Sequence, residues 1–72
     1  MKKVTIETPY ITLGQFLQFT DVIQSGGMAK WFLAEYLVLV NGEEEDRRGR
    51  KLYPGDQVTL SEEDQYIVQA KN

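Results

Sequence analysis

The amino-acid sequence predicts a small α+β domain, with two packed helices against a small, mainly antiparallel sheet of about four to five short strands. In the first half, apolar residues repeat at helical spacing in two segments. In the second half, short alternating or β-branched runs are separated by Asn-Gly and Pro-Gly turn signals. Because the chain has only 72 residues, of which 42% are apolar, we expect one ordered domain over residues 1–72.

The N-terminal segment predicts a strand, a break and a helix. The strand begins at Val4 and is broken at Pro9, because proline lacks the N–H and restricts the residue before it. Thr12 is the candidate N-cap of a helix over about residues 13–20, and Gln15 stands at the capping-box spacing. The expected core stripe of this helix is Leu13, Phe16, Leu17 and Thr20.

A second helix is predicted to begin at Gly26, with Ser25 as its N-cap. Trp31 falls partly off the apolar stripe of this helix, so we expect it at the edge of the core, with an exposed platform for a base or a protein as the alternative. The expected stripe is Ala29, Phe32, Leu33 and Tyr36.

The strands of the second half are delimited by turn residues. Residues 37–40 form a β-branched run, and Asn41-Gly42 predicts a type I′ hairpin turn after it. The return strand, residues 43–46, has no side chain suited to a core, so we expect a water-facing edge. A loop through residue 51, a Pro54-Gly55 turn, a strand over 57–60, a polar turn over 61–65 and a last strand over 66–68 complete the prediction.

The composition excludes several chemistries. The chain has no Cys and no His, which excludes a thiolate nucleophile, an imidazole base and Cys-ligated metal sites. The four consecutive acids of 43–46 point alternately to opposite faces of a strand, so they do not converge on a metal. No apolar stretch reaches the length of a signal peptide or a membrane span. We therefore expect a non-enzymatic, cytoplasmic protein without metal, cofactor, small-molecule substrate or membrane partner.

The charge is unevenly distributed. The net charge is −3, but Arg47, Arg48, Arg50 and Lys51 lie within five residues, and without this +4 segment the rest of the chain carries −7. Guanidinium groups bind phosphate oxygens bidentately, so the segment is a candidate nucleic-acid contact. The alternative is a solvated loop neutralised by the acidic run before it.

Ser25-Gly26-Gly27 and Lys30 form a second candidate site. The start of a helix exposes unpaired N–H groups, two glycines allow an anion to approach the backbone, and Lys30 lies over the same end of the helix. This pattern is not a Walker loop, because the G-x-x-x-x-G-K-[ST] motif is absent. An ordinary helix start is the alternative to a phosphate site.

The order of these motifs resembles the S-four RNA-binding domain, the alpha-L motif named after a ribosomal small-subunit protein. The resemblance covers about residues 11–60, and the sequences of these motifs are similar to those of small stand-alone members of the YaaA type. It is carried by Ile11-Thr12-Leu13-Gly14-Gln15-Phe16-Leu17, Ser25-Gly26-Gly27, Ala29-Lys30-Trp31-Phe32-Leu33, Val38-Leu39-Val40-Asn41-Gly42, the 47–51 segment and Pro54-Gly55-Asp56-Gln57-Val58.

The resemblance implies a module that binds structured RNA, expected to be ribosomal RNA or a ribosomal particle, with a role in large-subunit maturation. It also joins the two candidate sites into one RNA-binding surface. Two alternatives remain: a protein-interaction module that uses Trp31 and the acidic edge, and DNA or single-strand binding through the basic loop. The expected phosphate-binding residues are Ser25, Gly26, Gly27, Lys30, Arg47, Arg48, Arg50 and Lys51.

Overall fold

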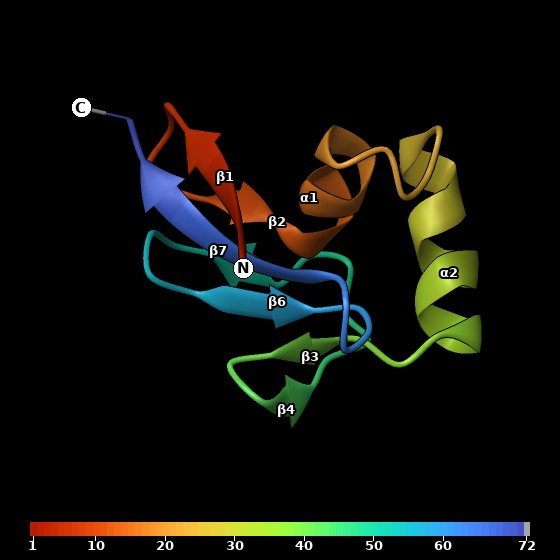
Figure 1. Cartoon of the computed structure of the whole chain (residues 1–72). Coiled ribbons are helices and arrows are strands. Elements are labelled where there is room, and N and C mark those ends of the chain that lie inside the picture. Colours follow the sequence, from red (N-terminus) through yellow and green to blue (C-terminus); the bar gives the residue numbers. More distant parts are fainter. Residues whose placement is uncertain (72) are drawn as a thin grey trace.

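The computed structural model describes residues 1–71, which form a five-stranded sheet, a two-stranded sheet and two helices on one side of them (Figure 1). The predicted α+β class is confirmed. The strand order is β1-β7-β6-β3-β4 in the larger sheet and β2-β5 in the smaller. The elements are β1 (Lys2–Ile6), β2 (Ile11–Thr12), α1 (Leu13–Phe19), the 3₁₀ helix η1 (Gly26–Met28), α2 (Ala29–Glu35), β3 (Leu39–Val40), β4 (Glu43–Glu44), β5 (Lys51–Leu52), β6 (Gln57–Thr59) and β7 (Gln65–Ala70).

The larger sheet is antiparallel except at one edge. β1 pairs in parallel with β7, with Val4 opposite Val68, so the first and last strands lie side by side. The pairs β6–β7, β3–β6 and β3–β4 are antiparallel. The last strand, β7, covers Gln65–Ala70 and is longer than the predicted 66–68.

The core lies between the larger sheet and α1. Phe16 is fully buried and meets the ring of Tyr66 edge-on, with ring centroids 5.2 Å apart. Leu13 and Leu17 are also fully buried, as the helical repeat predicts, whereas Thr20 is half-buried. Ala29 and Leu33 are the buried residues of α2, so the predicted packing of the two stripes is confirmed for these residues.

Several predicted local signals form as expected. The Gln15 N–H donates to Thr12 Oγ1 at 3.2 Å and the Thr12 N–H to Gln15 Oε1 at 2.9 Å, which completes the capping box. Asn41 and Gly42 have φ values of +52° and +85°, as a type I′ turn requires, and Gly55 has a φ of +100°.

The second helix and its stripe differ from the prediction. Residues 26–28 form a 3₁₀ turn, α2 begins at Ala29, and the side chain of Ser25 makes no capping hydrogen bond. Trp31 and Tyr36 are 73% and 62% exposed, so the expectation of a core-edge Trp31 and a core-facing Tyr36 is wrong. The physical reason is the short helix: α2 buries only Ala29 and Leu33, and Tyr36 is its extended C-cap, so it no longer follows the helical repeat.

The acidic return strand and the basic loop also differ. β3 and β4 are only two residues long each, and Glu45, just beyond β4, is buried rather than water-facing. The end of the predicted loop is a strand, because β5 pairs with β2 through Ile11–Leu52 and Thr12–Lys51. The unpredicted small sheet brings the basic segment to the start of α1.

Within residues 1–71, no helix has the length and apolar character needed to cross a membrane, and no group of acidic side chains is arranged to hold a metal ion.

Candidate nucleic-acid interface

The basic loop is held against the start of α1 by its backbone. The Leu13 N–H donates to the Arg50 carbonyl at 2.8 Å, and the Gly14 N–H donates to the Arg48 carbonyl at 2.9 Å. These bonds satisfy helix N–H groups that would otherwise be unpaired. The loop is therefore fixed relative to α1 without using its cationic groups.

Gly14 allows this close approach. A Cβ at Gly14 would lie 3.4 Å from the Arg48 carbonyl oxygen and 3.6 Å from the Ala29 Cβ. The residue thus marks the point where the loop, α1 and α2 meet. Sequence reasoning did not assign it a role, although a glycine inside a helical pattern is a signal for close packing.

A shallow groove of about 290 Å³ runs between the helices and the loop. It brings Gly26 next to Arg48 and Gly49, so parts of the two candidate sites share one surface. Gln18 lines the same groove, and a Cβ at Gly26 would lie 3.6 Å from its Oε1. In residues 1–71 no acceptor meets the N–H of Gly26 or of Gly27, and Lys30 is an exposed residue in the first turn of α2.

Arg47 and Arg50 are engaged by Glu45. Arg47 donates through Nε at 3.0 Å and Nη2 at 3.1 Å, and Arg50 donates through Nη1 at 2.7 Å. The Glu45 side chain is 6% exposed, whereas those of Arg47 and Arg50 are 72% and 33% exposed. Glu45 thus neutralises part of the positive charge of the loop, although the sequence predicted that this residue faces water.

This arrangement perturbs the acid strongly. The hydrogen bonds from the Arg47 side chain, aided by Arg50 and opposed by burial, lower the pKa of Glu45 from 4.5 to about 2. The same contact raises the pKa of Arg47. Both ends of the pair therefore stay charged at neutral pH.

Three of the predicted cations have no carboxylate partner within residues 1–71: Lys30, Arg48 and Lys51. Lys51 lies over the ring of Tyr10 at 4.9 Å, and Tyr10 contacts Tyr53 with ring centroids 5.7 Å apart. Lys51 and Tyr53 also line a hollow of about 450 Å³ beside Arg47 and Arg50. The surface therefore combines cations and open amides, which can bind phosphate oxygens, with exposed aromatic rings, on which bases can stack.

Comparison with known proteins agrees with this architecture. A family model described as the S4 domain matches residues 4–69. The chain is 67% identical over 57 residues to a protein of Bacillus subtilis (strain 168) called "Probable ribosome maturation protein RlbA", an overlap of 79% of this chain and 80% of that relative. The resemblance predicted from the motifs is confirmed: the chain belongs to the S4 domain family.

Proposed function

We propose that the protein binds structured RNA through the surface formed by the basic loop, η1 and the starts of the two helices. The observation that carries this proposal is the backbone docking of residues 48–50 onto the first turn of α1. It fixes the unpaired Arg48 beside the groove that Gly26 lines, so little order has to be gained there on binding. The phosphate backbone of RNA is a partner of opposite charge.

The predicted residues take different parts in this proposal. Arg48, Lys51 and Lys30 have no acidic partner in residues 1–71 and make the main phosphate contacts. The amides of Gly26 and Gly27, with the neighbouring Ser25 hydroxyl, receive a further phosphate oxygen. Arg47 and Arg50, already bonded to Glu45, keep N–H groups free for phosphate and fix the shape of the loop.

We infer further that the RNA is ribosomal and that the protein acts in maturation of the large subunit, as a non-enzymatic factor of the cytoplasm. The printed name of the Bacillus subtilis relative supports the ribosomal role. The absence of Cys and His supports a role in binding rather than catalysis, because the commonest nucleophile–base pairs need one of them.

A salt titration with a structured ribosomal RNA fragment tests the proposal. If the three unpaired cations contact phosphates, the slope of log affinity against log salt is about −3 for a duplex-like RNA. Replacing Lys30, Arg48 and Lys51 by Gln should lower affinity at least roughly tenfold and flatten the slope. A matched control replaces Lys2, Lys3 and Lys71 by Gln, which changes the net charge equally.

The control variant should bind within about twofold of wild type, because its cations lie outside the groove and the basic loop. An equal loss of RNA affinity in both triple variants would show that only the net charge matters, which would contradict the proposed surface. Duplex DNA and single-stranded RNA of equal length serve as competitors. If either competes as well as the structured RNA, preference for structured RNA is refuted.

A further inference from the structure

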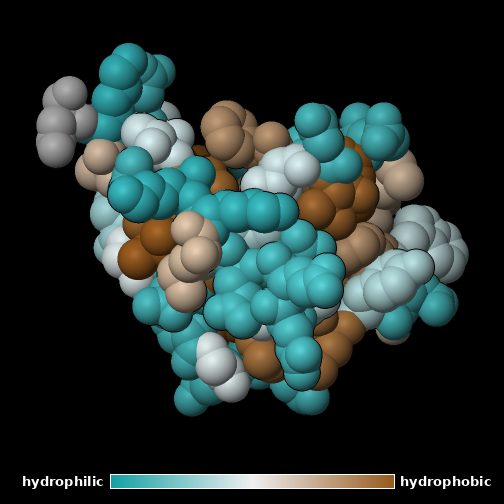
Figure 2. All heavy atoms as spheres, viewed as in Figure 1, coloured by the Kyte–Doolittle hydropathy of each residue, from teal (hydrophilic) through white to brown (hydrophobic). Residues whose placement is uncertain are grey.

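The outer face of α2 carries an aromatic groove that lies outside the proposed RNA-binding residues. Trp31 and Tyr36 are 73% and 62% exposed, and with the partly buried Phe32 they line an open groove of about 350 Å³. Figure 2 shows hydrophobic residues reaching the surface between α1 and α2. Exposed aromatic residues that cluster in this way mark interaction sites more often than solvated surface.

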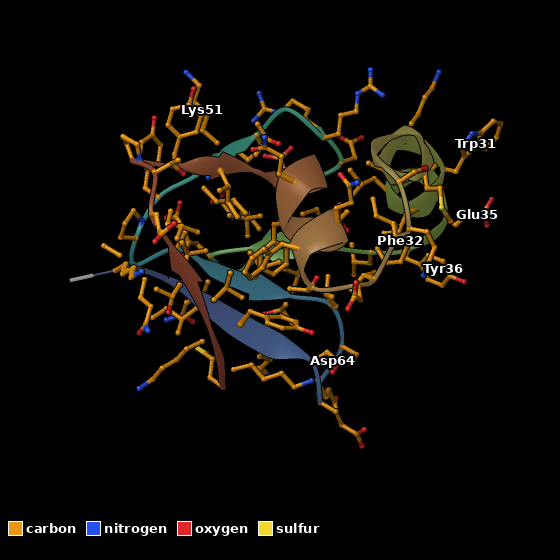
Figure 3. All side chains as sticks on the ribbon, turned by 90° about the horizontal axis from the view of Figure 1, so that it is seen from above. Trp31, Phe32, Glu35, Tyr36, Lys51 and Asp64 are labelled. Atoms are coloured by element: carbon orange, nitrogen blue, oxygen red, sulfur yellow. The ribbon has the colours of Figure 1, made fainter. Side chains whose placement is uncertain are left out.

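The groove is preorganised. The Tyr36 ring stacks on Phe32 with centroids 4.8 Å apart and an interplanar angle of 30°. Phe32 packs against the core, so the stack holds Tyr36 in place just beyond the end of α2. Trp31 and Glu35 are one helical turn apart on the same face, and Figure 3 shows both at the outer side of α2.

Tyr36 also lines a second hollow of about 390 Å³, which continues toward β4 and contains Leu37, Glu44 and Asp46. Glu35, Glu44 and Asp46 form no ion pair within residues 1–71, and no Lys or Arg lines either hollow. The combined surface therefore joins aromatic side chains and carboxylates and has no cation in its lining.

We propose that these two hollows bind a basic polypeptide segment with an apolar anchor, on a partner protein. Trp31, Tyr36 and Leu37 receive the aliphatic or aromatic anchor, and Glu35, Glu44 and Asp46 pair with flanking Lys or Arg side chains. Aromatic rings rimmed by carboxylates also favour cations over the ring faces. The charge selects this occupant, because complementary charge at an interface directs partner choice.

The same charge argues against two other occupants. Phosphates would meet three unpaired carboxylates at this surface, and Figure 3 shows Lys51 on the other side of the molecule from Tyr36. A second copy related by a two-fold axis would bring the acidic rims of both chains together, because such an interface uses the same patch twice. Binding of a basic segment here leaves the RNA surface free.

The test uses the full chain and Trp31, which is the single tryptophan and therefore a specific fluorescence reporter. The probe is the synthetic peptide Lys-Arg-Leu-Lys-Phe-Arg-Leu-Lys. Two matched peptides replace either its cations by Glu or its apolar residues by Ser. The first peptide should shift the Trp31 emission to shorter wavelength with saturation, and each matched peptide should bind at least roughly tenfold more weakly.

Charge-reversal variants localise the effect. Glu35→Lys with Glu44→Lys should weaken binding of the basic peptide at least roughly tenfold. The control, Glu62→Lys with Glu63→Lys, changes net charge equally at residues that line neither hollow and should retain binding within about twofold. A peptide labelled with a fluorophore reports affinity independently of Trp31, and circular dichroism verifies the fold of each variant.

Three outcomes overturn the proposal. One is equal binding of the three peptides, or no binding of the basic one. Another is a loss of affinity for the structured RNA in Trp31→Gln, which assigns the groove to RNA. The third is concentration-dependent self-association, seen by sedimentation and abolished by Trp31→Gln, which assigns the groove to a second copy.

Discussion

The start and the outer face of α2 contribute to two different surfaces. Its start lies beside the basic loop, where Gly26, Ala29 and Arg48 line a shallow groove and Lys30 is exposed. Its outer face and end carry Trp31, Glu35 and Tyr36, beside the acids of β4. Lys51 and Tyr36 lie on different sides of the molecule in Figure 3. The net charge of −3 therefore describes neither face.

Glu45 forms the boundary between these faces. The acids next to it in sequence lie on the surface, whereas Glu45 is buried and holds Arg47 and Arg50. The basic loop thus depends on one acid from the acidic run. A run of like residues can thus be divided among separate roles by the direction of each side chain.

Replacing Glu45 should have the largest effect. The Glu45→Ala variant loses four hydrogen bonds with Arg47 and Arg50, and we expect the free energy of unfolding to fall by about 2–3 kcal/mol. Urea unfolding followed by circular dichroism at pH 7 measures the loss. Its neighbour Glu44 is exposed, so Glu44→Ala should change stability by at most about 0.5 kcal/mol. Equal losses in the two variants would contradict the boundary role.

The same residue predicts an acid-dependent loss of stability. Because the folded state lowers the pKa of Glu45 from 4.5 to about 2, its contribution is complete above about pH 5 and lost as the pH falls toward 2. Unfolding free energies of the wild type should therefore decline through this window. Glu45→Gln, which cannot ionise, should show a smaller decline over the same range. Parallel pH profiles for the two proteins would refute this linkage.

Enlarging Gly14 should separate the basic loop from α1. Gly14→Leu forces side-chain atoms into the contact with the Arg48 backbone, so we expect a stability loss of about 1–3 kcal/mol and weaker RNA binding. Gly14→Ala is the control, because its Cβ would lie at van der Waals distance and alanine favours helices by roughly 0.8–1 kcal/mol. Thermal unfolding and RNA titration at a temperature where both variants are folded provide the readouts. Full RNA affinity in folded Gly14→Leu would show that docking of the loop is not required.

A substitution at Gly27 should change RNA affinity and helix stability in opposite directions. A Cβ at this position meets nothing within 4 Å, and φ is not positive, so Gly27→Glu is sterically allowed. The new carboxylate should preserve or raise the melting temperature, because glutamate favours the helix start, while RNA affinity falls roughly tenfold or more. Lys30→Gln provides a second variant that keeps most of the stem and removes the charge. If both folded variants retain full affinity, residues 25–27 are an ordinary helix start.

Replacing Trp31 should have the smallest effect on the fold. Since Trp31 is 73% exposed, Trp31→Gln should change the free energy of unfolding by at most about 0.5 kcal/mol and leave RNA affinity unchanged. Thermal unfolding and the same RNA titration test both expectations. A loss of RNA affinity would show that Trp31 belongs to the RNA-binding surface, which would contradict the separation of the two faces.

Local sequence signals predicted the local structure well. Thr12 and Gln15 form their capping box, Asn41-Gly42 adopts positive φ at both positions, and Gly55 does so after Pro54. These features depend on residues a few positions apart, so sequence spacing was sufficient to predict them. The motif order also predicted the S4 family.

The class of fold, the two helices, the turns and the concentration of cations in one segment follow from the sequence. Which of those cations are paired depends on the folded structure, because Glu45 is buried and bonded to Arg47 and Arg50 while its neighbours Glu44 and Asp46 are exposed. The folded structure also decided that β5 pairs with β2 and that Gly14 receives the loop. Finally, it left Trp31 and Tyr36 exposed, because helical periodicity identifies the residues that share a face but not how much of that face another element covers.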